Sequence, residues 1–209
     1  MHLENVVIDA LDPQVLGGFW ETALGSERLT DEADIVETRL AYDGGFFLDL
    51  CFQQVPEPVT VAPRLHLVVA EAPGPSVDPE GNAFRARAGA GPLVAIELDS
   101  ADPDRDVAFW SWLTGWTEVD PHTLAHPDRV GPLVVLVPEQ GPKTATKNRM
   151  HLDVRLGPGE DADEVEAAIL ERGGRRLAPE WGELPWRTYL DPSGNELCVL
   201  PAPRSSTET

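Results

Sequence analysis

The sequence has only two cysteines and few basic residues, and it lacks any long apolar stretch. Its 16 lysines and arginines stand against 36 acidic residues, which gives a formal charge of -20. Such a charge repels phosphate backbones and anionic lipid surfaces, so we expect neither nucleic-acid nor membrane partners. No apolar run approaches the roughly 20 residues that a helix needs to cross a bilayer.

The low cysteine content and the lack of a long apolar run predict a soluble cytoplasmic protein. The first residues, Met1 to Asn5, lack the basic and apolar pattern of a signal peptide. Both cysteines, Cys51 and Cys198, lie in apolar, strand-like runs, and a disulfide between them is disfavoured in a reducing cytoplasm. The small polar residues at the end of the chain predict a disordered tail over 204–209.

The most informative feature of the sequence is an internal repeat. The Asp-Pro pair at 12–13 recurs at 102–103, Phe-Trp at 19–20 recurs at 109–110, and a glycine at 25 recurs at 115. In each copy a strand-like run precedes the aspartate, which can cap a helix that starts with proline. The glycine suits a left-handed C-terminal cap. About three strand-like runs follow, so the repeated unit reads as βαβββ, with both tryptophans expected in the core.

A second pair of similar segments divides the chain further. The run Arg64–Leu67, with His66, matches Arg149–Leu152, with His151, and Asp-Pro-Glu-Gly-Asn at 78–82 matches Asp-Pro-Ser-Gly-Asn at 191–195. The latter pair has the chemistry of tight turns. Between histidine and turn, the second copy has room for a helix over 161–172, whereas the first has only a short segment rich in proline and alanine. We therefore expect a truncated module over 1–90 and a complete module over 91–203.

The order of these segments, repeated twice, resembles the glyoxalase-like domains of the vicinal oxygen chelate superfamily, which includes glyoxalases, bleomycin resistance proteins and dioxygenases. The resemblance implies an α+β fold in which tandem βαβββ units form curved mixed sheets. It also implies that each curved sheet forms a cup that holds a metal or a small ligand. On this basis we expect each module to form a cup of its own.

The same resemblance places metal ligands on the first strand, the fourth strand, the strand after the linker and the last strand. Only His66 and His151 keep a usual donor, because other residues stand at the first-strand and last-strand positions: Asn5, Ala95, Arg85 and Cys198. Three or four donors must converge to hold a metal ion well. We therefore expect no metal and no other cofactor, with zinc, nickel or iron as the alternative.

Four polar residues are candidates for ligand binding. His66 and His151 are each either a polar contact, or general base, on the cup floor or a hydrogen-bonded core histidine. Asp153 lies on the same strand face as His151, where it can orient the imidazole. Glu97 either faces the cup or lies on a solvated face.

Cys198 and three aromatic residues complete the candidate set. The thiol of Cys198 is either a ligand or nucleophile, or an inert buried group. Trp181, Trp186 and Tyr189 cluster near a loop rich in proline and glycine. Aromatic rings on such a loop either stack on a planar ligand at the cup mouth or cover the edge of the sheet.

Taken together, the sequence predicts a protein that binds a small, planar organic ligand in the cup of the second module without a metal. His151 would supply a polar contact on the floor, and the loop aromatics would supply stacking surface. The alternative is a divalent-metal-dependent lyase, isomerase or dioxygenase. No residue fixes a reaction, and a homodimer stays open.

Overall fold

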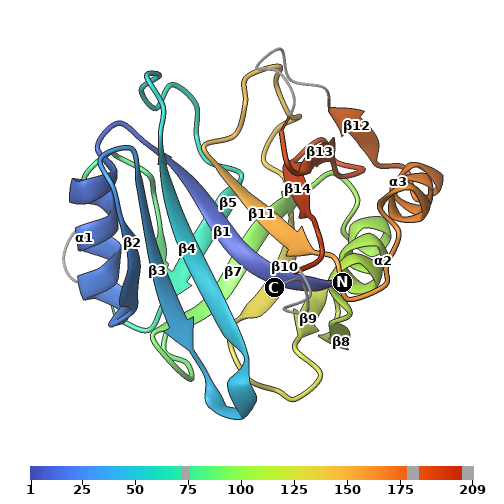
Figure 1. The fold of residues 1–209 in the computed structure, drawn as a ribbon, viewed down its shortest axis with the longest axis horizontal. Helices are drawn as coiled ribbons and strands as arrows, with labels where there is room; N and C mark the ends of the chain where they lie inside the picture. The colour runs from blue at the N-terminus through green and yellow to red at the C-terminus, as the bar shows by residue number, and fades with distance from the viewer. Residues whose placement is uncertain (72–75, 178–183, 204–209) are drawn as a thin grey trace, which may run out of the picture.

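A computed structural model describes residues 1–71, 76–177 and 184–203. Two βαβββ units are present (Figure 1). The first contains β1 (His2–Ala10), α1 (Pro13–Leu24), β2 (Glu27–Asp31), β3 (Ile35–Ala41) and β4 (Phe47–Gln54). The second contains β7 (Leu93–Ser100), α2 (Pro103–Thr114), β8 (Thr117–Asp120), β9 (Thr123–Ala125) and β10 (Leu133–Pro138). This is the predicted α+β fold.

The remaining elements begin with the two strands that carry His66 and His151. After the first unit come β5 (Leu65–Val69) and β6 (Arg85–Ala86). After the second come β11 (Met150–Arg155), α3 (Ala162–Glu171), β12 (Arg175–Leu177), β13 (Arg187–Leu190) and β14 (Glu196–Leu200). In the described part of the chain, no helix is long and apolar enough to cross a membrane.

Both repeated helices begin and end where the sequence predicts. Asp12 accepts hydrogen bonds from the backbone N–H groups of Gln14 and Val15 at the start of α1, and Asp102 accepts one from Arg105 at the start of α2. The two C-terminal glycines adopt left-handed conformations, with φ of 64° at position 25 and 73° at position 115. A side chain is rarely stable at these angles, which explains the repeated glycine.

The strands form two sheets, each of which draws on both modules. The eight-stranded sheet has the order β12-β13-β14-β11-β1-β4-β3-β2, and the six-stranded sheet has the order β6-β5-β7-β10-β9-β8. The expectation that each module closes a cup of its own is therefore wrong. The connecting segments after β4 and β10 carry the chain from one sheet to the other, so β1 pairs with β11 and β5 pairs with β7. The ranges 1–90 and 91–203 describe the repeat and not the sheets.

The main hydrophobic core of the described residues contains side chains from both sheets and from the helices. Each sheet turns one face toward this core, which receives Ile8 and Leu152 from the larger sheet and Ile96 and Val134 from the smaller one. Strand residues alternate between faces, so the intervening side chains point away from the core. Both repeated tryptophans, at 20 and 110, are fully buried in the core, as predicted.

The two tryptophans also occupy matching environments. The indole N–H of Trp20 donates to Asp78 at 3.4 Å, and that of Trp110 donates to Asp191 at 3.2 Å. Each acceptor is the first residue of one of the repeated turns. In the second turn, the other carboxylate oxygen of Asp191 accepts from the backbone N–H groups of Ser193 and Asn195. The helix of each module is thus bonded to the turn of the same module.

Two buried arginines link each turn to the opposite module. Arg64, just before β5, donates through Nε to Asn195 at 2.7 Å, and Arg149, just before β11, forms an ion pair with Glu80 at 2.8 Å. The two contacts correspond to one another under the repeat. These contacts, together with the strands of each module that pair with strands of the other, hold the two modules together.

Burial makes Asp191 sensitive to pH. Loss of solvent raises the pKa of its carboxyl to about 6, although hydrogen bonds from Asn195 and Trp110 oppose the rise. A carboxyl whose pKa is raised on folding binds its proton more tightly in the folded state. Its ionisation therefore lowers the stability as the pH rises from about 4 to about 6 and keeps it low above that range.

We predict that Asp191→Asn removes this dependence. The variant should lose about 1–3 kcal/mol at neutral pH, because an amide N–H then faces donors. Between pH 7 and pH 4 the free energy of unfolding of the wild type should rise relative to the variant by about 2 kcal/mol. Urea denaturation at several pH values measures both quantities. Parallel pH profiles would contradict the prediction.

Candidate functional site

The candidate site lies on the face of the eight-stranded sheet that points away from the core, which we call the His151 face. Residue pairing brings polar side chains from four adjacent strands into one row on this face. Asn5 on β1 pairs with Asp49 on β4 and with Asp153 on β11, and Asp153 pairs with Cys198 on β14. The expected sharing of a face by His151 and Asp153 is confirmed by their contact.

Three of the predicted residues meet on the His151 face. The Nε2 atom of His151 lies 3.3 Å from Oδ1 of Asp153 and 3.4 Å from Sγ of Cys198. The potential metal-binding atoms of the three residues all lie within 4.8 Å of one another. Of the donors usual in the family this group has His151 alone, and Asp153 and Cys198 approach it because β11 pairs with β14.

One polar atom of this group lacks a partner. Nδ1 of His151 is buried and has no hydrogen-bond partner within the described residues, whereas Oδ1 of Asp153 is buried and contacts Nε2 of His151. The other carboxylate oxygen of Asp153 accepts a hydrogen bond from the Asn5 amide at 3.3 Å. A buried polar atom without a partner costs about 1–3 kcal/mol, so such atoms indicate a place where another molecule completes the bonding.

Asp49, which sequence reasoning missed, belongs to the same row but is already engaged. Arg39 on β3 binds both carboxylate oxygens of Asp49, at 2.8 and 2.7 Å. The Asn5 amide is likewise directed at Asp153. The four-position ligand set that the family resemblance implies therefore does not fit these residues, whereas the closer group of His151, Asp153 and Cys198 has the spacing of a three-ligand site. A carboxylate inside the apolar run of β4 was the available signal for Asp49.

Both cysteines are buried free thiols. Burial raises the pKa of the Cys198 thiol, and the neighbouring Asp153 carboxylate raises it further. Burial likewise raises the pKa of the Cys51 thiol. A thiol with a raised pKa is a poor nucleophile at neutral pH, which favours the inert alternative for Cys198 in the free protein.

His66 and Glu97 lie together on the other sheet. They face each other across β5 and β7. The carboxylate of Glu97 is buried and forms ion pairs with Arg85 and Arg87, so this residue is not on a solvated face. Nδ1 of His66 lies 3.3 Å from the carbonyl oxygen of Ala83, and burial lowers the pKa of the imidazole. Both polar side chains here are in contact with protein groups, unlike Nδ1 of His151.

The structure describes two of the three aromatic residues that were predicted at the rim. Tyr189 is fully buried on the core side, where its hydroxyl donates to Glu166 of α3 at 2.8 Å, so its assignment to the rim is wrong. The reason is strand alternation: Thr188 pairs with Cys198, which turns Tyr189 to the opposite face. Trp186 is partly buried. Trp181 lies outside the described residues, as does the predicted tail over 204–209.

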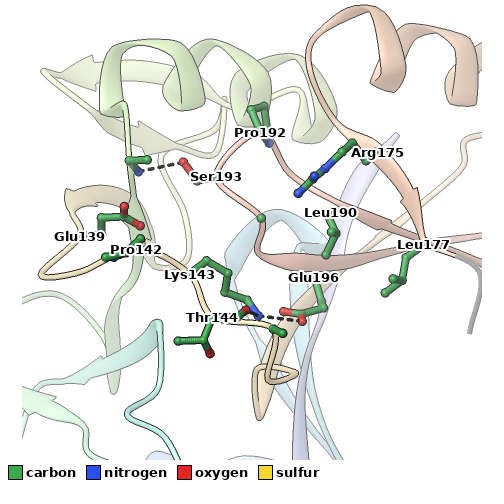
Figure 2. Close-up of a pocket in the computed structure, with 13 residues that line it drawn as sticks. Glu139, Pro142, Lys143, Thr144, Arg175, Leu177, Leu190, Pro192, Ser193 and Glu196 are labelled. Carbon is green, nitrogen blue, oxygen red and sulfur yellow. Dashed lines mark hydrogen bonds and ion pairs between the residues drawn. The ribbon is translucent and has the colours of Figure 1, made fainter.

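A pocket of about 550 Å³ adjoins the His151 face (Figure 2). It lies between the segment 139–145 and the strands β12 and β13. Arg175 pairs with Leu190, and Leu190 pairs with Glu196, so these three lining residues form one row. Glu196 precedes the partner of Leu152 and therefore lies beside His151 on the same face. Sequence reasoning missed this pocket because its walls come together only in the folded sheet.

The paired βαβββ units and the polar sheet face define a protein of the vicinal oxygen chelate class. The chain belongs to the family described as glyoxalase-like domain, whose model matches residues 5–88 and 95–200. No curated protein matches the sequence closely enough to count as a relative.

Solved structures support the same fold. Glyoxalase I from Zea mays is 17% identical with a TM-score of 0.63, and the match covers 96% of this chain and 92% of that one. A putative dioxygenase from Bacillus subtilis is 12% identical with a TM-score of 0.60, covering 98% and 86%. The cppA protein from Streptococcus pneumoniae is 12% identical with a TM-score of 0.56, covering 96% and 98%. At these identities the likeness establishes the fold alone.

The buried thiols give a direct prediction. In the native protein at pH 7.5, neither Cys51 nor Cys198 should react with a thiol reagent such as DTNB within minutes, because both are buried and protonated. After unfolding in urea, both should react at once. The single variants Cys51→Ala and Cys198→Ala assign each signal. Fast labelling of native Cys198 would mean that an accessible thiolate is present.

Proposed function

We propose that this protein binds a small organic ligand on the His151 face, with the adjoining pocket holding part of the molecule. The observation that carries the proposal is the buried Nδ1 atom of His151, which has no hydrogen-bond partner within the described residues and belongs to a side chain in contact with Asp153. The binding surface is built by strands of both modules, rather than by the second module alone.

The residues of this face limit the chemistry of the ligand. An imidazole nitrogen can donate or accept a hydrogen bond, whereas an ionised carboxylate only accepts. A ligand with a hydroxyl or N–H group beside a carbonyl could therefore bond to Nδ1 of His151 and to Oδ1 of Asp153 together. We propose that the ligand is planar, with Trp186, which is partly buried, as the candidate aromatic residue for stacking.

The face of the six-stranded sheet that carries His66 and Glu97, which we call the His66 face, gives weaker support for a ligand. The Glu97 carboxylate there is held by two arginines, and His66 lies close to a backbone carbonyl oxygen. A new molecule would have to displace protein partners instead of filling empty positions. The proposal thus assigns different roles to the two repeated histidines.

A second candidate function is divalent-metal catalysis of the lyase, isomerase or dioxygenase type. It is favoured by the close approach of nitrogen, oxygen and sulfur donors from His151, Asp153 and Cys198. Three protein ligands with one open position are typical of catalytic zinc sites. Bound there, a metal would polarise an oxygen atom of a substrate. We place binding without a metal first because Asp49 is held by Arg39 and the Asn5 amide faces Asp153.

Native mass spectrometry of protein purified without a chelating column tests the proposal. We expect the wild type to carry a small organic molecule at one copy per chain. His151→Ala should lose it, because the variant removes a polar contact from the site. The matched variant His66→Ala removes the equivalent histidine of the other sheet and should retain the molecule.

The same spectra separate the two candidate functions. A stoichiometric mass increase of a divalent ion, lost in Asp153→Asn, would favour the metal-dependent function over the metal-free one. Loss of the organic molecule in His66→Ala but not in His151→Ala would move the site to the other sheet and contradict the proposal.

A further inference from the structure

We infer that the ligand carries a single carboxylate group, which Arg175 holds in the pocket beside His151. The inference rests on the proposed function, because it names the chemical class of the molecule that the His151 face would bind. It follows from the charges, the shape and the position of the pocket.

Of the charged side chains that line the pocket, one cation has no charged partner within the described residues. Glu139 forms an ion pair with Arg64 at 2.8 Å, and Glu196 forms one with Lys143 at 3.2 Å. Within the described residues, the guanidinium of Arg175 has neither an ion-pair nor a hydrogen-bond partner. Figure 2 shows Arg175 reaching from β12 toward the middle of the ring of lining side chains.

The residue opposite Arg175 has no side chain to obstruct it. A Cβ atom added to Gly194 would lie 3.9 Å from a terminal nitrogen of Arg175 and 3.3 Å from Cγ of Lys143. The two basic side chains therefore flank the same glycine. Its positive φ of 84° also disfavours any larger residue. Both Gly194 and Arg175 line the pocket, so its space adjoins the guanidinium and lets an anion approach.

The balance of charge favours a carboxylate over a phosphate. The planar guanidinium matches the two oxygens of a carboxylate in a bidentate geometry. One negative charge neutralises Arg175, whereas a second would meet the carboxylates of Glu139 and Glu196 in the same pocket. A monocarboxylate thus completes the charge pairing, and a dianion does not.

The rest of the pocket fits an apolar body. Its wall includes aliphatic and proline side chains, among them Pro142, Leu177, Leu190 and Pro192. Two strands, β13 and β14, separate β12 from β11, so the backbones beside Arg175 and His151 lie about 14 Å apart. A molecule with a carboxylate at one end and a ring at the other spans that distance once the two side chains are included.

The probe is 3-phenylpropanoate, with the neutral 3-phenylpropanamide as its isostere. Binding to the full-length protein is measured by two-dimensional NMR, which also follows the Arg175 Nε–H signal. We expect the carboxylate, but not the amide, to bind and to shift that signal. Arg175→Gln should weaken carboxylate binding by at least about tenfold, since one charge-assisted bidentate contact is lost.

Arg176→Gln is the matched control. Arg176 is the next residue of β12 and points to the other face, where it contacts Glu166 and the ring of Tyr189. The variant removes the same charge from the protein outside the pocket and should leave carboxylate binding unchanged. Equal weakening in both variants would reveal a general charge effect and overturn the inference.

Two other outcomes would also overturn it: unchanged carboxylate binding in Arg175→Gln, or inorganic phosphate binding as tightly as the carboxylate.

Failure of the inference remains distinguishable from failure of the proposed function. If the molecule that co-purifies with the wild type is lost in His151→Ala but kept in Arg175→Gln, the His151 face binds a ligand by other means. If Arg175→Gln loses the probe and His151→Ala keeps it, the pocket binds carboxylates independently of that face.

Discussion

The arrangement of the candidate site depends on a buried carboxylate, that of Asp191. It accepts hydrogen bonds from the indole of α2 and from the backbone of its own turn. The turn leads directly into β14, whose residues Glu196 and Cys198 line the pocket and the His151 face. Because a buried charge without partners would cost several kcal/mol, the helix and the turn are held in one relative position. Because the turn leads into β14, this constraint also fixes the geometry of the row of polar residues.

Local chemistry made much of the fold predictable. The aspartate caps, the proline starts and the glycine ends of α1 and α2 are signals within a few residues, and all are present in the structure. The turns at 78–82 and 191–195 could be recognised for the same reason. Burial of Trp20 and Trp110 followed from their position on the helix face. These features need no knowledge of what lies far away in the chain.

The parts that could not be predicted depend on pairing between distant segments. The exchange of strands between modules brings β1 beside β11, and nothing within either segment specifies that choice. The cluster of His151, Asp153 and Cys198 depends on the pairing of β11 with β14. Tyr189 was misplaced because a shift of one residue in a strand reverses the face to which a side chain points. Arg175, on a three-residue strand, carried no signal at all.

The two sheets show how a repeated residue can diverge in role. His66 and His151 occupy matching places in the repeat, yet within the described residues only the second has a buried nitrogen atom without a partner. The central claim is therefore that the His151 face, and not the His66 face, binds the ligand. Hydrogen-exchange mass spectrometry tests it by comparing protein that retains its co-purified molecule with protein stripped of it. The account predicts slower exchange in peptides covering β11 and β14. Slower exchange confined to β5 and β7 would contradict it.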